Sequence, residues 1–555
     1  MPVTLNSTVL PTVVTFNITN KGYTLSGSGS VSGTGSVVVN GGATLTNNLV
    51  NNYTGGTTLN NNSALLLGAG ASIGTGKVNM GAGTSKVIVS SSSAVTLPTL
   101  AGTGGTPQII QNGAGVTSLT GSAADTFLSA VVNNGTLQLA APSTASVHAL
   151  GSSSTINSGG ILQLAGSGGD QLASGVTLTN IGGILDTVGL SEQFTALTGY
   201  GGVIGGGTLS LSGFLGLSGA GTLGVTNSTM TITTASAQWL REPGSVVFDG
   251  GTLNLPSIAY TGVGAAGNQN IYINCLVTTA GNGETIFGES NESSITTFGP
   301  NANASFWFLS YKDAFANTFW YNGGGIALNR LNYRGANNGA AISSHYFNGT
   351  TFTTKVNNAG FMGAGTGSNV KFFVSTNGLI LNDAGFNVGI PATLAHDPAL
   401  GASLDGGLIK SGSGILTLAA TNTFNGSVTV NGGTLILNNV GSYNNVIFAD
   451  NTTNQISVAQ VGVSLTNNSL SLGTTGSGTQ NLNFNLGTLG IPTQPVLKVI
   501  NVLTNTGNVA VYLTAPLLVP GTAPLIKYGN MDAANFAATW SIAPFPYVNL
   551  TLTND

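Results

Sequence analysis

Few residues of this chain could act as catalysts. A glycosidase or polysaccharide lyase needs two carboxyl groups, or a carboxyl group and a cation, held close together. The nearest candidates in the sequence are Glu289 with Glu292, and the run His396-Asp397 with Asp405. The two glutamates lie among polar residues typical of a solvated loop, and Asp405 falls in a turn. Neither group combines an acid, a base and a stabilising cation, so we expect a protein without enzymatic activity.

Metal ligands are equally scarce. The three histidines, His148, His345 and His396, are far apart in the sequence, and the single cysteine is Cys275. A structural zinc site needs about four such ligands, and a disulfide needs two cysteines. We therefore expect no metal, no cofactor and no disulfide. Cys275 lies in Ile-Tyr-Ile-Asn-Cys-Leu-Val and is expected to be a small buried apolar residue.

A different kind of chemistry is available between residues 287 and 386, which hold nearly half of the aromatic residues. Aromatic rings stack on sugars and anchor protein interfaces. One interpretation is therefore a ligand-binding surface that includes Trp307, Tyr311, Trp320 and Tyr321. The other is structural, because alternation such as Phe319/Tyr321 places rings on one face of a strand, where they would fill a wider coil or a small β insertion. We favour the structural interpretation.

The fold that positions these residues is indicated by a repeated phrase, a Gly-Gly or Asn-Gly turn followed by alternating apolar residues. Its first leucine recurs at Leu137, Leu162, Leu185 and Leu209, in steps of 25, 23 and 24 residues. A similar spacing relates the upstream residues Leu45, Leu65, Val87 and Ile109. Short alternating strands at this period predict a β-solenoid, in which stacked coils bury a continuous core. We expect Leu137, Leu162, Leu185 and Leu209 to point inward in one column.

The composition supports a solenoid. Charged residues make up 5% of the chain, whereas a typical globular domain has about 25%. Stacked side chains lie about 4.8 Å from their equivalents, so like charges would repel, whereas Asn and Thr ladders form hydrogen bonds. The 41% of hydrophobic residues argues against disorder.

Two classes of partner are disfavoured. With 12 Lys and Arg residues and a net charge of −4, the chain has no basic stripe for nucleic acid. No apolar run reaches the roughly 18 residues of a membrane span.

Residues 405–437 resemble a known repeat. They contain Gly-Leu-Ile-Lys-Ser-Gly-Ser-Gly-Ile-Leu-Thr-Leu, then Asn-Thr-Phe-Asn-Gly and Val-Asn-Gly-Gly-Thr-Leu. This pattern is similar to the autotransporter-associated β-strand repeat, also called the passenger-associated transport repeat. A weaker copy lies at 53–67, where Tyr53 corresponds to Phe424 and Gly55 to Gly426.

Two further stretches resemble members of this group. His396-Asp397-Pro398 is similar to the run-in before the repeat, and residues 520–528 are similar to a closing module. The resemblance implies a right-handed parallel β-helix displayed outside the cell, with a structural or adhesive role. The N-terminus lacks the start of a signal peptide, so either the numbering begins at a mature or trimmed end or the protein is not secreted by that route. No membrane barrel or sorting tail follows, so we do not expect export by self-transport.

The sequence therefore predicts an all-β chain of five segments, a right-handed parallel β-helix with coils of roughly 20–25 residues. The segments are an assembly strand at 1–20, a solenoid at 21–284, an aromatic-rich β region at 285–390, the β-strand repeat at 391–440 and a closing β region at 441–555. We expect a non-enzymatic extracellular or cell-surface structural protein that self-assembles into a fibre or coat. The alternatives are an adhesin that binds surface glycans through its aromatic region, and a tailspike-like or lyase-like enzyme.

Both ends of the sequence are apolar, alternating and nearly uncharged. Such ends resemble open sheet edges, whereas soluble solenoids normally carry polar caps. We therefore expect head-to-tail contact between copies of the chain, without a membrane span. The residues expected to mediate it are Val13, Val14, Phe16, Ile18, Leu517, Leu518, Val548 and Leu550.

Overall fold

The structure of the 555-residue chain is a computed structural model. It describes residues 1–17, 19, 21–121, 127–144, 146–168, 170–213, 215–217, 221–233, 238–241, 245–256, 259–261, 268–281, 284–287, 294–311, 316–333, 342–363, 370–438, 440–488, 490–515, 521–531, 539–546 and 549–554. The chain divides into two compact units, Met1–Pro256 with Tyr260–Gln269, and Ser257–Ala259 with Asn270–Asp555.

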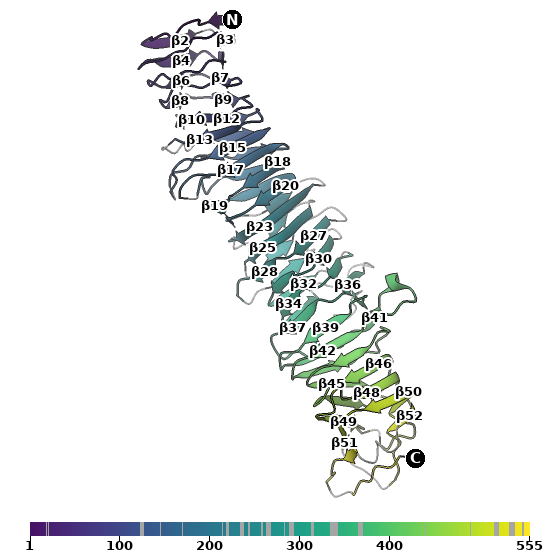
Figure 1. Ribbon diagram of the computed structural model, residues 1–555. Helices are drawn as coiled ribbons and strands as arrows, with labels where there is room; N and C mark the ends of the chain where they lie inside the picture. Colours follow the sequence, from purple (N-terminus) through teal and green to yellow (C-terminus); the bar gives the residue numbers. More distant parts are fainter. Residues whose placement is uncertain are drawn as a thin grey trace. The chain divides into compact units, whose positions relative to one another are not determined.

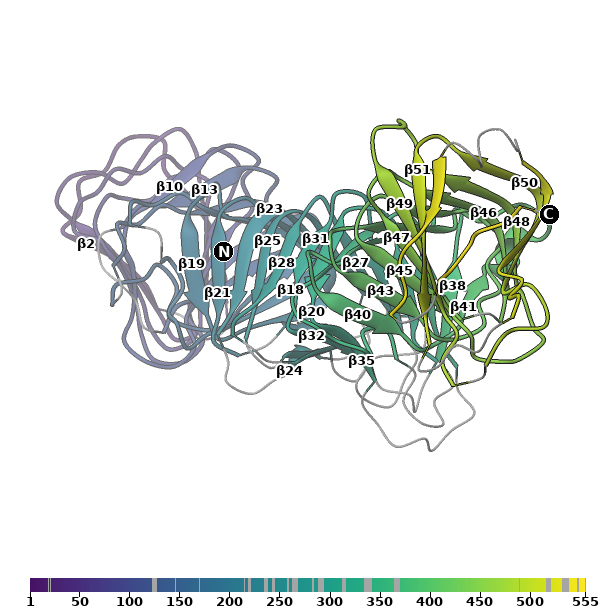
Figure 2. The same ribbon diagram turned by 90° about the horizontal axis from the view of Figure 1, so that it is seen from below.

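Each unit is built from short parallel strands stacked coil upon coil (Figure 1), a β-solenoid architecture with about 17 turns in total. In the first unit β3 (Gly22–Ser26) pairs with β5 (Thr44–Asn47), and β5 pairs with β7 (Ala64–Leu67). In the second unit β45 (Thr434–Asn438), β47 (Thr453–Ser457), β49 (Thr479–Asn485) and β51 (Asn508–Thr514) lie side by side (Figure 2). The predicted solenoid is confirmed.

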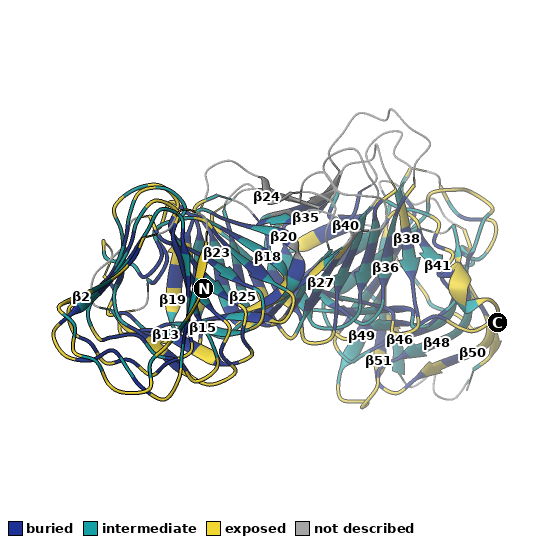
Figure 3. Cartoon of the chain, turned by 90° about the horizontal axis from the view of Figure 1, so that it is seen from above, coloured by how far each residue is buried: buried dark blue, intermediate teal, exposed yellow. Residues whose placement is uncertain are grey.

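Along most described strands, buried residues alternate with more exposed ones, as the burial pattern shows (Figure 3). The upstream spacing corresponds to a continuous inner column, because Leu45 pairs with Leu65, Leu65 with Val87 and Val87 with Ile109. All four side chains are at most 2% exposed. The step of 20 to 22 residues in the sequence is therefore one turn of the solenoid.

The second predicted column is correct for three of its four leucines. Leu137 pairs with Leu162, and Leu162 with Leu185, but Leu185 pairs with Ile204. Leu209 is also fully buried, yet it belongs to a neighbouring column. The prediction for Leu209 is wrong because residues 201–204 form the next layer above Leu185, so the Gly-Gly-Gly-Thr-Leu phrase starts the following strand of the same coil.

Polar ladders cover the outer surface, as the composition predicted. Asn133 Nδ2 donates to Asn112 Oδ1 over 2.7 Å, and Asn157 Nδ2 donates to Asn133 Oδ1 over 2.6 Å. Gln138 and Gln163 form a second ladder with a 2.6 Å amide bond. These neutral side chains bond to their equivalents in the next coil, where stacked charges would repel.

The aromatic-rich region continues the coil architecture. β30 (Ser294–Phe298) pairs with β33 (Thr318–Tyr321), and β36 (Ser343–Phe347) pairs with β33 and β38 (Val370–Val374). Inside these coils Phe298 stacks on Tyr321 and Tyr321 stacks on Phe347, with ring centroids 6.0 and 5.4 Å apart. The coil step between equivalent residues is 23 residues, then 26 and 27, so large rings fill longer turns.

Candidate functional site

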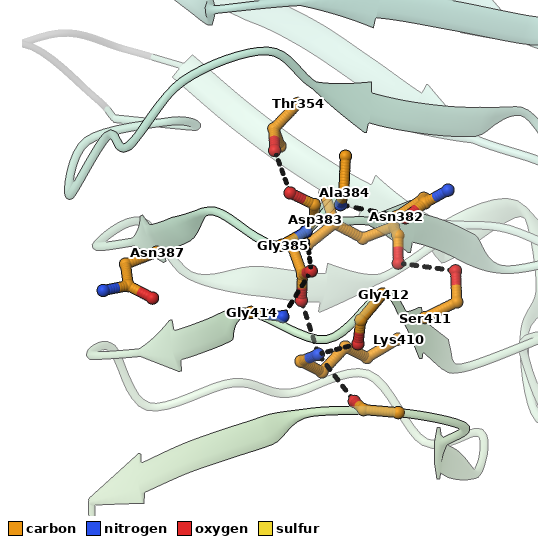
Figure 4. Close-up of polar contacts among 12 residues, drawn as sticks. Thr354, Asn382, Asp383, Ala384, Gly385, Asn387, Lys410, Ser411, Gly412 and Gly414 are labelled. Carbon is orange, nitrogen blue, oxygen red and sulfur yellow. Dashed lines mark hydrogen bonds and ion pairs between the residues drawn. The ribbon is translucent and has the colours of Figure 1, made fainter.

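The lysine of the repeat motif lies at the centre of a buried polar site. Lys410 belongs to β42 (Leu408–Ser411), which pairs with β39 (Leu379–Asn382), and Asp383 follows β39 directly. The Lys410 side chain points inward, in a column between Leu381 and Val430. Its Nζ lies 2.5 Å from Asp383 Oδ2, and both side chains are completely buried (Figure 4).

Backbone groups satisfy the rest of this ion pair. Lys410 Nζ also donates to the carbonyl oxygens of Gly412, at 3.2 Å, and Gly432, at 2.7 Å. Asp383 Oδ1 accepts from the N–H groups of Gly385 and Gly414, at 2.9 and 2.8 Å. Burial lowers the pKa of Lys410, and the hydrogen bond to Asp383 opposes that shift. Because these partners come from three successive layers, the pair ties each layer to the next.

The glycines of the motif are required by this packing. Gly412 has φ = 88°, a conformation that L side chains rarely adopt. A Cβ atom on Gly414 would lie 2.1 Å from the carbonyl oxygen of Phe386. The Lys-x-Gly-x-Gly spacing therefore sets a tight turn whose main-chain groups can reach the ion pair.

The sequence candidates His396, Asp397 and Asp405 lie just before this site, and the structure brings only two of them together. His396 Nδ1 lies 2.8 Å from Asp405 Oδ2. The Asp405 carboxylate also accepts from the N–H groups of Gly407, Asn425 and Gly426, at 2.8 to 2.9 Å.

Asp397 faces a different partner. Its Oδ2 accepts from Ser375 Oγ at 2.7 Å, and its Oδ1 caps the 3-10 helix η1 (Pro398–Leu400) by accepting from Ala399 N. The three candidates therefore make the contacts of turn-forming and capping residues.

The remaining site candidates have different environments. Glu289 and Glu292 lie outside the described residues, as does the side chain of Tyr311. Trp307 and Trp320 are half-buried, whereas Tyr321 is fully buried in the core stack and cannot contact a surface ligand. The prediction that Tyr321 binds a ligand is therefore wrong. Successive side chains of a strand point to opposite faces, so Tyr321 points inward where Trp320 points outward.

An outer aromatic ladder was only partly foreseen. Trp320 stacks on Tyr346 with centroids 4.1 Å apart, and Tyr346 stacks on Phe373 at 5.0 Å. All three rings are half-buried on the outer face. The adjacent aromatic pairs Tyr346-Phe347 and Phe372-Phe373 indicate outer rings in the sequence, because one member of each pair must face outward.

The residues expected to mediate assembly are partly described. Val13 is 51% exposed, Val14 and Leu550 are half-buried, and Phe16 is buried. Ile18, Leu517, Leu518 and Val548 lie outside the described residues.

A buried acid at Glu192 was missed entirely. Its carboxylate accepts from Gln171 N at 2.8 Å and from Leu172 N at 3.2 Å, and the side chain is inside the coil. Burial raises the pKa of Glu192 to about 9, and the neighbouring Asp170 carboxyl adds to the shift. In the strand Ser-Glu-Gln-Phe, the glutamate is recognised as inward-facing only when the strand register is known.

The described residues offer neither a group of metal ligands nor a membrane-spanning helix. Within them, no group of three or more His, Cys, Asp or Glu residues could hold a metal ion. Cys275 is buried, as expected. No helix in the described part of the chain is long and apolar enough to cross a membrane.

Comparison with known proteins gives one match. The passenger-associated transport repeat family matches residues 408–437, which span Lys410 and the glycines of its turn. No curated protein and no solved structure matches the chain. The chain therefore carries a passenger-associated transport repeat within a β-solenoid, a combination that fits an autotransporter passenger domain at the cell surface or secreted from the cell.

Proposed function

We propose that the chain is a non-enzymatic structural subunit that polymerises head to tail outside the cell into a fibre or surface coat. The observation that carries this proposal is the open sheet edge at the N-terminus. β2 (Val13–Asn17) pairs with β4 (Ser36–Asn40) on one side, and among the described residues no strand pairs with its other side.

The hydrogen-bond register identifies the free groups of this edge. Ser36 N donates to Thr12 O, so the main-chain groups of Thr12 face β4. Main-chain groups alternate in direction along a parallel strand. Those of Val14 and Phe16 therefore also face β4, whereas those of Val13 and Thr15 face away from it.

The side chains at this edge are apolar. Leu10 is 74% exposed and Val13 is 51% exposed, and no charged side chain occurs in residues 1–20. Monomeric β proteins usually protect such an edge with charge, proline or a covering segment. An exposed, uncharged edge instead favours addition of a strand from another chain.

The C-terminal end offers a second edge. β52 (Ile526–Asn530) pairs with β50 (Leu497–Asn505), and Leu497 N donates to Leu525 O. By the same alternation, the main-chain groups of Ile526 and Tyr528 face away from β50. Two different edges on one chain support heterologous contacts, which lead to open filaments.

The assembly proposal is tested by blocking the N-terminal edge. Val13→Lys places a charge on the edge, and Thr15→Pro removes an N–H group that faces away from β4. Val116→Lys is the matched control, because Val116 is an exposed valine (36%) on a strand paired on both sides. Light scattering should show polymers for the parent and the control and small particles for both edge variants. Unchanged polymerisation of both edge variants would refute the N-terminal contact.

A second candidate is glycan adhesion, favoured by the outer ladder of Trp320, Tyr346 and Phe373. An amide ladder runs beside it, in which Asn348 Nδ2 donates to Asn322 Oδ1 at 3.0 Å. Against this candidate, the stacked rings cover one another's faces, which are the surfaces that sugars contact. A glycan array would detect binding that Trp320→Ala and Tyr346→Ala abolish, with the exposed Tyr512→Ala as control.

A further inference from the structure

An exposed loop projects between β41 (Leu394–His396) and β42, and it immediately precedes the passenger-associated transport repeat. It begins with η1, and its residues 401–404 are exposed, with Leu404 60% accessible. Turn hydrogen bonds hold it together internally, from Leu400 N to Asp397 O and from Ser403 N to Leu400 O. Its two ends are β41 and Asp405.

The His396 ring connects the middle of this loop to its end. Nδ1 lies 2.8 Å from Asp405 Oδ2, and Nε2 lies 3.1 Å from Gly401 O. In the part of the chain that the structure describes, the hydrogen bond between His396 Nε2 and Gly401 O connects the middle of the loop to β41. The imidazole therefore acts as a bridge between the loop and the first turn of the repeat.

Both atoms that face the ring can only accept hydrogen bonds. A carbonyl oxygen has no proton, and the Asp405 carboxylate already accepts three backbone N–H groups. A neutral imidazole carries one N–H, so its other nitrogen would point a lone pair at an oxygen. Only the doubly protonated ring satisfies both contacts.

From this geometry we propose that His396 is a pH-operated latch, which holds loop 398–404 against the repeat while its ring is charged and releases the loop when the ring loses a proton. Of the charged groups around the ring, Asp405 is hydrogen-bonded to it, and Asp397 acts on it only through its charge. The hydrogen bond to Asp405 raises the pKa of His396, and partial burial opposes this shift. Release is therefore expected above the ordinary histidine pKa of about 6.5.

Opening of the loop leaves the solenoid stacked. β41 keeps its pairing with β38, β42 keeps its pairing with β39 and β44 (Val428–Val430), and Asp405 keeps its backbone donors. The released segment becomes accessible to proteases and to partners, next to a repeat that remains folded. This adds a switchable segment to the structural role and does not depend on polymerisation.

The test is hydrogen exchange measured peptide by peptide, at about pH 6 and about pH 9. His396→Arg keeps a charged donor at both pH values, and His396→Ala removes the latch at both. Comparing variants at the same pH cancels the intrinsic effect of pH on exchange. Peptides from β42 and β44 report whether each variant keeps the folded repeat.

Near pH 6 the loop of the parent protein should exchange at the rate seen in His396→Arg. Near pH 9 it should exchange at the rate seen in His396→Ala, which is about tenfold faster than the rate in His396→Arg at that pH. Three results would overturn the latch: a parent loop that matches the Arg variant at both pH values, a parent loop that already matches the Ala variant near pH 6, or an Ala variant whose loop is as protected as that of Arg.

Discussion

Lys410 Nζ lies 2.5 Å from Asp383 Oδ2, and neither side chain is exposed. This pair spans two layers of the solenoid, and Lys410 reaches a third through Gly432. The signature lysine of the transport repeat therefore acts in the interior of the coil. Its hydrogen bonds link the successive layers from which the repeat is built.

Removing one partner of this pair should destabilise the repeat strongly. Lys410→Met leaves a buried carboxylate without its cation, which costs about 3–5 kcal/mol. Adding Asp383→Leu to Lys410→Met should recover part of the loss, because no buried charge then remains. Denaturant unfolding measures both variants, with the exposed Lys498→Met as control. Equal stability of Lys410→Met and Lys498→Met would contradict this role.

Two adjacent leucines offer a direct test of the inside and outside of the coil. Leu65 is 1% exposed in an inner column, whereas Leu66 faces outward on the same strand. Leu65→Asp should cost several kcal/mol, because it buries an unpaired charge, and Leu66→Asp should cost much less. Thermal unfolding compares the two variants. A similar effect at both positions would be incompatible with the assigned faces.

Gly414→Ala should destabilise the motif turn. The added Cβ would lie 2.1 Å from Phe386 O, so the backbone must move and the N–H bond from Gly414 to Asp383 would weaken. Gly175→Ala is the control, since a Cβ there meets no atom within 4 Å. Hydrogen exchange in β42 and β43 (Ile415–Leu418) measures the effect. Wild-type protection in Gly414→Ala would show that the turn is not tightly constrained.

Glu192 should make the stability depend on pH. Its pKa is raised from 4.5 to about 9 in the folded chain, so the folded state binds a proton that the unfolded state releases above about pH 4.5. The contribution of the protonated Glu192 to the free energy of unfolding is thus complete below about pH 4.5 and is lost progressively as the pH rises to about 9.

Glu192→Gln should remove this pH dependence, because glutamine carries no ionisable proton. Unfolding measured across that range compares Glu192→Gln with Asp186→Asn, a variant at a half-buried carboxylate on the outer face. The same loss of stability with pH in the parent and in Glu192→Gln would contradict a raised pKa.

The sequence predicted the solenoid because its apolar spacing records one turn directly, as in the column from Leu45 to Ile109. It misplaced Leu209 because the same Gly-Gly-x-Leu phrase occurs on two strands of one coil. A motif marks a turn followed by a strand, and it does not say which face of the coil that strand occupies.

The polar sites were less predictable. Lys410 was visible only as part of a resemblance, and its partner Asp383 lies 27 residues earlier in the preceding layer. Glu192 gave no motif, since an inward glutamate is recognised only when the strand register is known. His396 and Asp405 are acid–base candidates in the sequence, but their hydrogen bonds to Gly401, Asn425 and Gly426 tie them to a loop and a turn.

Head-to-tail assembly is tested most directly by electron microscopy of the purified chain over a range of concentrations. The open edges at β2 and β52 predict unbranched filaments of a single width that persist in high salt, because few ion pairs are available to be screened. Single particles at every concentration, with the β-solenoid confirmed as folded by circular dichroism, would contradict it.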